Sequence, residues 1–467
     1  MSNEKTPART LPANPAQKTE EMIAREDRYL SDRRGDPGSP YFAEGISPRS
    51  RGRRSFVNSL ATLGSLGILG SRQSLAASAG STEHDVPADA SKTQGYPLED
   101  TSYGTRSQFE TEVRRRFKTA TPQSSWTMTP LEASCGIITP SGLHFERSHG
   151  GTAVIDPARH TLYVHGMVKQ PKKFSMRDLR RFPSLSRVLF IECSGNGLTE
   201  WSKPTMRTVQ FTHGLTSTSE WTGVALSTIF DECGGVPANA KWALFEGGDA
   251  AAMTRSIPIE KALKDCFLAY GQNGEAIRPE QGYPLRLIVP GFEGNMHIKW
   301  LRRIEVSDAP FMTREETSKY TDLLPSGKAV QFSFEMEAKS VITFPSGEML
   351  LDGPGFYEIS GLAWSGRGAV KRVDVSTDGG STWRAAALQG PVLPVCHTRF
   401  RLPWRWDGKE TILQSRCIDE TGYVQPTLGQ LIAVRGLNGP LGSVYHLNAI
   451  QSWLVEADGK VSNVHHY

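Results

Sequence analysis

The feature that most restricts this chain is an apolar run that leads directly into a cysteine and a glycine-rich turn. Residues 188–197 read Val-Leu-Phe-Ile-Glu-Cys-Ser-Gly-Asn-Gly. A short apolar run ended by glycines predicts a buried strand that delivers a thiol where the strand stops. The glycines let the backbone bend sharply and let a bulky group approach the sulfur. Taken alone, Cys193 can be a soft metal ligand, a nucleophile or a small core residue.

Length and charge restrict the class of protein. The 467 residues are enough for two ordinary domains, and no window approaches the roughly 18 apolar residues that span a bilayer. The first 79 residues hold 12 Lys and Arg against 8 Asp and Glu, so the remainder carries 41 of each. The body of the chain is therefore electrically balanced. This balance argues against non-specific binding to nucleic acid or to an anionic membrane.

The N-terminal region has the order of an export signal. Residues 1–48 are polar and rich in proline, and residues 50–58 read Ser-Arg-Gly-Arg-Arg-Ser-Phe-Val-Asn. A modest apolar run at 60–70 and a small-residue site ending at Ala79 come next. The order predicts a twin-arginine signal at 1–79, cleaved near Ala79, with an N-terminal extension at 80–124. The alternative is a basic loop beside a short helix. Because this route carries folded proteins, we expect a periplasmic protein that acquires its cofactor before export.

Several cations lie in apolar or extended surroundings. In an extended chain, Phe145, Arg147 and His149 share one face, and an arginine beside a histidine can bind an anion. An exposed strand with a surface ion pair is the alternative. Arg286 lies within an apolar run, and Lys299 lies between large apolar neighbours. Since buried cations need partners, several of them around one thiol suggest a large anionic cofactor.

The remaining pattern predicts two kinds of domain. Strands and short helices alternate up to about residue 312, and short alternating strands separated by turns begin at about 325. An Asp-Gly turn at 378–379 and the strand spacing favour a β-sandwich of immunoglobulin type. The expected segments are strands at 161–166, 242–245, 358–364, 371–376, 399–402 and 411–416, a capped helix at 174–179, and a helix ending near 234.

Motifs over residues 125–467 resemble, in order, those of the sulfite oxidase family of molybdenum enzymes. The resemblance implies an α+β chain, with a mixed α/β molybdopterin domain at 125–318 and an immunoglobulin-like β-sandwich dimerisation domain at 319–467. The matching segments are Phe-x-Arg-x-His at 145–149, Cys-x-Gly-Asn at 193–196, Trp-x-Gly-Val at 221–224, the region 256–270, Pro-Leu-Arg at 284–286, Val-Pro-Gly at 289–291 and Lys-Trp-Leu at 299–301.

The resemblance also implies roles for particular residues. Cys193 matches the family's thiolate ligand of molybdenum, a soft donor that suits this metal. Arg147, Tyr320 and Arg435 match residues that face the substrate. Residues that match positions gripping the pterin and its phosphate are Phe145, Arg147, His149, Asp249, Arg286, His297, Ile298 and Lys299.

Four positions depart from the family pattern. Gly197 and Leu198 stand where sulfite oxidases carry arginine, Gln281 replaces a histidine, and Lys319 replaces an acidic residue. Loss of the arginine widens the pocket and weakens its hold on free sulfite. We therefore expect room for a substrate presented on a carrier protein. The alternative is that Lys319 or Arg435 restores the charge, in which case sulfite remains a substrate.

Within the family, the export signal, the Cys-Ser-Gly-Asn-Gly turn and the Asn-Ala-Ile-Gln-Ser-Trp segment at 448–453 most resemble the molybdenum subunits of sulfane dehydrogenases. This likeness implies oxidation of cysteine-bound sulfane sulfur on a sulfur-carrier protein in thiosulfate oxidation, with one molybdenum–molybdopterin per chain. It also implies a dihaem c-type cytochrome partner and a homodimer within a heterotetramer. A sulfite:cytochrome c dehydrogenase is the alternative, and a cofactor-free binding or adhesion protein is a third reading.

Cysteine spacing is consistent with an external electron acceptor. The chain has six cysteines and no Cys-x-x-Cys-His, so no covalent haem is expected in this chain. With Cys193 on the metal an odd number remains, and no complete disulfide framework is implied. Molybdenum cycles by two electrons, so a separate c-type cytochrome is the simplest acceptor.

Overall fold

The computed structural model describes residues 103–117, 119–437 and 445–466. The predicted export signal at 1–79 lies outside the described residues. Residues 112–467 belong to one compact unit, and this unit contains every strand and helix of the described ranges. In the described part of the chain no helix has the length and apolar character needed to cross a membrane.

Three sheets form the first half of the unit. Apart from the parallel pair β4 and β13, their strands pair antiparallel, so the sheet arrangement is mixed as expected. The first sheet is β1 (Arg115–Phe117), β2 (Ser125–Met128) and β3 (Glu146–Ser148). The second has the order β11 (Glu275–Ala276), β10 (Phe267–Gln272), β7 (Thr216–Ala225) and β6 (Ser184–Glu192), with β12 (Arg286–Ile288) also on β10. The third has the order β5 (Lys172–Ser175), β4 (Thr161–Gly166), β13 (Leu301–Ser307), β8 (Trp242–Gly247) and β9 (Thr254–Pro258).

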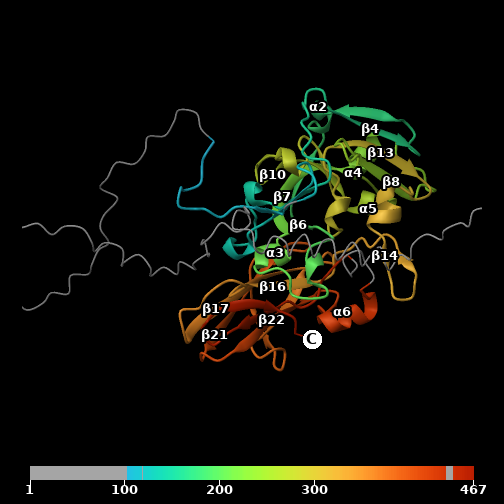
Figure 1. The fold of residues 1–467 in the computed structure, drawn as a ribbon. Helices are drawn as coiled ribbons and strands as arrows, with labels where there is room; N and C mark the ends of the chain where they lie inside the picture. The colour runs from blue at the N-terminus through green and yellow to red at the C-terminus, as the bar shows by residue number, and fades with distance from the viewer. Residues whose placement is uncertain (1–102, 118, 438–444, 467) are drawn as a thin grey trace, which may run out of the picture. The chain divides into compact units, whose positions relative to one another are not determined.

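Short helices connect these strands (Figure 1). Residues of three of them, α2, α4 and α5, belong to the core that the two larger sheets share. The predicted capped helix is α2, where the Ser175 hydroxyl and the Asp178 carboxylate form a capping box. The helices are α2 (Met176–Leu179), α3 (Val209–His213), α4 (Leu226–Glu232) and α5 (Ile259–Lys264), with single turns η2 (Leu131–Ala133), η3 (Ser141–Leu143), η4 (Leu198–Glu200), η5 (Pro279–Gln281) and η6 (Gly294–Met296) and a π-helical turn η7 (Glu315–Lys319).

The C-terminal part of β6, from Leu189 on, is buried on both faces, which explains its uninterrupted apolar run. Leu189 and Ile191 pack into the core beneath β7 and β10. Phe190, on the opposite face, packs into the core of the second half of the unit. The strand ends at Glu192, so Cys193 is the first residue beyond it. The prediction of a buried strand that delivers this thiol is confirmed.

The second half is a β-sandwich, as expected (Figure 1). Its two antiparallel sheets enclose a core that includes Trp364, Phe400 and Trp453. One sheet has the order β16 (Lys339–Phe344), β17 (Gly355–Trp364), β21 (Thr398–Trp406) and β20 (Ala387–Gln389). The other has the order β19 (Arg384–Ala385), β18 (Val370–Ser376), β22 (Thr411–Asp419), β23 (Ser452–Val455) and β24 (Val461–Val464). The hairpin β14 (Asp322–Leu323) and β15 (Ala329–Val330) precedes the sandwich, and α6 (Leu428–Arg435) comes after β22.

A buried polar junction joins the two halves directly behind Cys193. The Glu192 carboxylate accepts hydrogen bonds from the Lys339 ammonium at 2.6 Å and from the Trp364 indole at 2.7 Å. The Asn196 amide donates to the same carboxylate at 2.9 Å. Glu192 and Lys339 are almost fully buried, and both sandwich residues lie on neighbouring strands, β16 and β17. The sandwich therefore fixes the strand end from which Cys193 projects.

Candidate active site

One cavity gathers ten of the eleven predicted site residues. The elements that contribute are β3, the turn after β6, the loop after β8, the segment 281–300 and the residue directly after η7. The predicted residues on its wall are Phe145, Arg147, His149, Cys193, Asp249, Arg286, His297, Ile298, Lys299 and Tyr320; Glu146, Ser148, Met253, Gln281, Gly294, Asn295 and Trp300 also line it.

Cys193 lies half-buried in a turn that hydrogen bonds hold closed. Its N–H donates to the Leu215 carbonyl, and its own carbonyl accepts from the Asn196 N–H, each at 2.9 Å. Burial raises the pKa of the thiol, although a backbone hydrogen bond from Gly195 and the charge of Arg147 oppose this. The site alone therefore favours the protonated thiol. Coordination to a metal would hold it as the thiolate.

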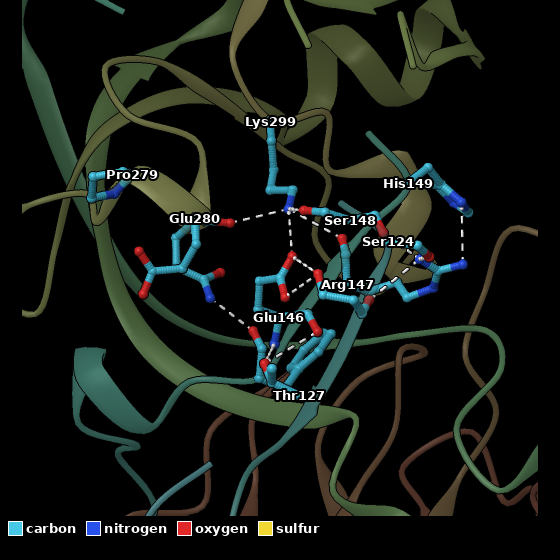
Figure 2. Close-up of polar contacts among 12 residues, drawn as sticks. Ser124, Thr127, Glu146, Arg147, Ser148, His149, Pro279, Glu280 and Lys299 are labelled. Carbon is cyan, nitrogen blue, oxygen red and sulfur yellow. Dashed lines mark hydrogen bonds and ion pairs between the residues drawn. The ribbon is translucent and has the colours of Figure 1, made fainter. Parts of the chain in front are cut away.

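Lys299 forms hydrogen bonds to both β3 and the turn η5 and so links them (Figure 2). Its ammonium donates to the Ser148 hydroxyl at 2.8 Å, to the Glu280 carbonyl at 3.0 Å and to the Arg147 carbonyl at 3.1 Å. The Glu146 carboxylate lies 3.7 Å away. Burial lowers the pKa of Lys299 to about 8, with Glu146 opposing the shift. The ammonium is thus a desolvated charge at the cavity wall.

Arg286 is a buried cation held by a neutral residue. Its Nη1 donates to both the backbone carbonyl and the side-chain oxygen of Gln281, each at 3.0 Å. Its Nε has no hydrogen-bond partner, and among the described residues no carboxylate pairs with it. Burial lowers the pKa of Arg286 to about 9. A desolvated guanidinium with an unused N–H at a cavity fits an anionic ligand group such as a phosphate or a pterin oxygen.

The departure at Gln281 therefore has a structural role. Besides holding Arg286, the Gln281 amide donates to the Phe145 carbonyl at 2.7 Å. It links β12 to the residue that precedes β3, across the cavity. The sequence pattern gave no indication of this link.

Three side chains form a hydrogen-bonded row on the cavity wall. Nη2 of Arg147 lies 3.2 Å from Nδ1 of His149, and Nε2 of His149 lies 3.4 Å from the Tyr320 hydroxyl. Burial, together with the charge of Arg147, lowers the pKa of His149 to about 4, so the ring is neutral. Since Nδ1 accepts from Arg147, the proton lies on Nε2 and points to Tyr320. Burial raises the pKa of Tyr320, so the phenol keeps its proton.

His297 lines the cavity, but the backbone uses both of its ring nitrogens. Nδ1 accepts from the Val289 N–H at 3.3 Å, and Nε2 lies 3.2 Å from the Phe292 carbonyl. Burial lowers its pKa to about 3. The ring therefore shapes the wall as a neutral group.

Arg435 does not line this cavity. Its guanidinium donates to the carbonyls of Tyr445 at 3.1 Å and His446 at 2.9 Å, and it pairs with Glu337 at 2.5 Å. It lines a neighbouring cavity with Glu337 and His446. Lys319 is exposed and also lies outside the wall of the first cavity.

A buried row of alternating charges connects Tyr320 to the sandwich. Arg255 pairs with Glu316 at 3.0 Å and with Glu293 at 3.2 Å, and its guanidinium lies 4.8 Å from the Tyr320 ring centre. The other Glu293 oxygen lies 3.0 Å from Nε2 of His446. Sequence reasoning missed this row, because its members are isolated charges in unrelated segments.

Sequence reasoning also missed Glu146, Ser148 and Asn295. The alternation of β3 directed attention to one face, whereas residues on both faces line the cavity. Asn295, whose amide donates to the Ser194 hydroxyl at 3.2 Å, carries no distinguishing pattern.

Two domain models match the chain. They are the oxidoreductase molybdopterin binding domain over residues 149–315 and the Mo-co oxidoreductase dimerisation domain over residues 330–452. Mitochondrial sulfite oxidase of Mus musculus is 31% identical over 345 residues, 68% of this chain and 62% of the mouse protein. NADH nitrate reductase of Cichorium intybus is 36% identical over 309 residues, 58% of this chain and 32% of that protein. The chain thus spans less than two thirds of each of these relatives.

The chain belongs to the sulfite oxidase family of molybdopterin oxidoreductases, which confirms the family resemblance and the expected pair of domains. Among solved structures, the sulfane dehydrogenase SoxCD from Paracoccus pantotrophus is 46% identical with a TM-score of 0.77. That match covers 80% of this chain and 96% of the SoxCD chain. The molybdopterin binding domain implies a molybdenum–molybdopterin cofactor, and the unused N–H of Arg286 fits its anionic groups.

Proposed function

We propose that this chain is the molybdenum subunit of a sulfane dehydrogenase that oxidises cysteine-bound sulfane sulfur on a sulfur-carrier protein. The observation that carries the proposal is a single cavity that holds Cys193, the buried cation Arg286, the partly buried cation Lys299 and the phenol of Tyr320. The likeness to SoxCD over 96% of that chain supports the choice within the family.

Different residues of the chain would bind the metal, the anionic groups of the cofactor and the substrate. A molybdenum–molybdopterin supplies oxygen-atom transfer to sulfur and two-electron redox chemistry when bound. Cys193 would hold the metal through its sulfur, and Arg286 and Lys299 would hold anionic groups of the cofactor. Arg147 and the protonated Tyr320 would donate to oxygen as negative charge develops on the oxidised sulfur.

Arg435 would act at a distance from the substrate. Its bonds to the carbonyls of Tyr445 and His446 hold a segment that lies against the Cys193 turn. This role is positioning, in place of the direct substrate contact expected from the sequence.

The partners and the location are parts of the same proposal. The electrons would pass to a dihaem c-type cytochrome, and two copies of the chain would pair through the dimerisation domain, giving a heterotetramer. The protein would be exported folded to the periplasm by the twin-arginine route. One cofactor per chain, and no haem in this chain, complete the arrangement.

A comparison of two substrates tests the proposal. The full chain, purified with its cytochrome partner, is given a persulfidated carrier protein or free sulfite, and cytochrome reduction is monitored. We expect stoichiometric molybdenum and a kcat/KM for the carrier about a hundredfold or more above that for sulfite, a difference of roughly 2.7 kcal/mol in transition-state binding. Equal or higher activity with sulfite would instead make the chain a sulfite:cytochrome c dehydrogenase. Absence of molybdenum from the purified protein would contradict both.

A further inference from the structure

The segment 445–447 of the sandwich half is fastened against the Cys193 turn. The His446 N–H donates to the Ser194 carbonyl at 2.9 Å. The Tyr445 N–H donates to the Asp322 carboxylate at 3.1 Å, and Arg435 binds the Tyr445 and His446 carbonyls. Hydrogen bonds to three residues, Ser194, Asp322 and Arg435, thus hold the backbone of this segment.

Side chains of the segment cover the glycines of that turn. A Cβ on Gly197, where φ is +87°, would lie 2.9 Å from a methyl group of Leu447. A Cβ on Gly195 would lie 3.9 Å from both the Cys193 sulfur and the Tyr445 ring. A larger side chain at Gly197 would displace Leu447, so the glycine and the segment fit one another.

Tyr445 is consequently a second phenol at the Cys193 turn, next to Tyr320 but not itself among the residues that line the cavity. Its ring centre lies 5.5 Å from that of Tyr320. The Tyr445 ring is only half-buried, and its hydroxyl has no hydrogen-bond partner within the described residues. The fold therefore holds the backbone of this tyrosine firmly and leaves its hydroxyl available.

We propose that Tyr445 is a substrate-binding residue whose hydroxyl, alongside that of Tyr320, donates a hydrogen bond to the oxyanion formed on the substrate sulfur. The inference deepens the proposed function and rests on it for the identity of the substrate. Two neutral phenols can stabilise an oxyanion without the strong attraction of an added arginine for a free dianion. This arrangement suits a substrate that its own carrier protein brings to the site.

The test compares Tyr445→Phe, which removes only the hydroxyl, with Tyr163→Phe as a control on the distant strand β4. Both are made in the full chain with its cofactor and cytochrome partner. Sulfate, an unreactive sulfur oxyanion, is titrated calorimetrically, and kcat and KM are measured with persulfidated carrier and with sulfite. Molybdenum content and the thermal midpoint are recorded for each variant.

We expect Tyr445→Phe to weaken sulfate binding and to lower kcat/KM by about tenfold, the effect of one hydrogen bond to a charged group. Its molybdenum content and thermal midpoint should match those of Tyr163→Phe. Wild-type sulfate affinity and wild-type kcat/KM in Tyr445→Phe would overturn the inference, as would a wild-type protein that binds no sulfate. If the wild type prefers free sulfite while Tyr445→Phe still loses sulfate affinity, the role of Tyr445 stands and the proposed carrier substrate fails.

Discussion

At the scale of single residues, the site depends on charges that the protein itself leaves incompletely paired. Arg286 bonds only to Gln281 through its Nη1, and its Nε is unused. Such a residue lowers the stability of the protein without its ligand, because a buried charge lacks solvation. The incompletely paired guanidinium of Arg286 is therefore suited to bind an anionic cofactor.

Replacement of Arg286 by methionine separates the contribution of this charge to cofactor binding from its cost to the stability of the cofactor-free protein. We expect molybdenum occupancy to fall about tenfold or more, because one or two charge-assisted hydrogen bonds to the cofactor are lost. The cofactor-free protein should stay folded with an unchanged or higher thermal midpoint. Metal analysis, pterin fluorescence after acid release and calorimetry measure these quantities. Arg401→Met, the same change at an exposed ion pair, is the control and should retain its molybdenum. Full occupancy in Arg286→Met would contradict the assignment.

At the scale of elements, β6 is the strand on which the site depends. Its alternate residues enter the cores of both halves, and its last residue, Glu192, is bonded to Lys339 and Trp364 of the sandwich. The position of Cys193 is thus set by one strand that two cores and one buried ion pair hold in place. A buried pair of this kind fixes geometry more than it adds stability.

Lys339→Met tests this junction. The substitution leaves the Glu192 carboxylate buried without its cation, and we expect a loss of about 3–5 kcal/mol in the free energy of unfolding. The double variant with Glu192→Gln should recover much of that loss, because no unpaired charge remains. Urea unfolding measures both. Lys409→Met, at an exposed pair with Asp407, should leave the curve unchanged. A Lys339→Met protein as stable as the wild type would show that the pair is not needed to hold β6.

At the scale of the whole unit, a row of buried charges joins the catalytic half to the sandwich. His446 lies between Glu293 at 3.0 Å and Glu337 at 3.6 Å. Burial alone would lower its pKa, but hydrogen bonds to the two carboxylates overcome that and raise the pKa to about 9. The imidazolium is therefore the cation that joins a carboxylate of each half.

This pKa predicts how stability depends on pH. The folded pKa of about 9 exceeds the ordinary value of 6.5, so the contribution of His446 is full below pH 6.5 and is lost as pH rises through 9. The shift corresponds to about 3 kcal/mol. We expect the difference in unfolding free energy between the wild type and His446→Gln to shrink by this amount from about pH 6 to about pH 10. His466→Gln, just beyond the last strand of the sandwich, is the control. A difference that stays constant over this range would contradict the charged state of His446.

Much of the fold could be predicted because its signals are local. The apolar run, the glycine turn and the two-residue alternation of the sandwich each act over a few residues. They were sufficient to place Cys193 at a strand end and to define two domains. The resemblance to the sulfite oxidase family supplied ten of the residues that line the cavity. The continuous apolar sequence predicted that the end of β6 is buried, but not that its two faces enter the cores of two different halves.

The sequence by itself determined that the thiol lies at a strand end, that Arg147, Arg286 and Lys299 belong to its site, and that the chain has two domains. Only the tertiary structure decided the partners of the charged residues: Arg435 binds the backbone of 445 and 446, and Gln281 binds Arg286. It also decided that Tyr445 contacts the Cys193 turn. The reason is physical. Periodicity and turn chemistry act between neighbours in the chain, whereas a buried charge takes the partner that long-range packing brings to it, which for Glu192 and Lys339 lies 147 residues away.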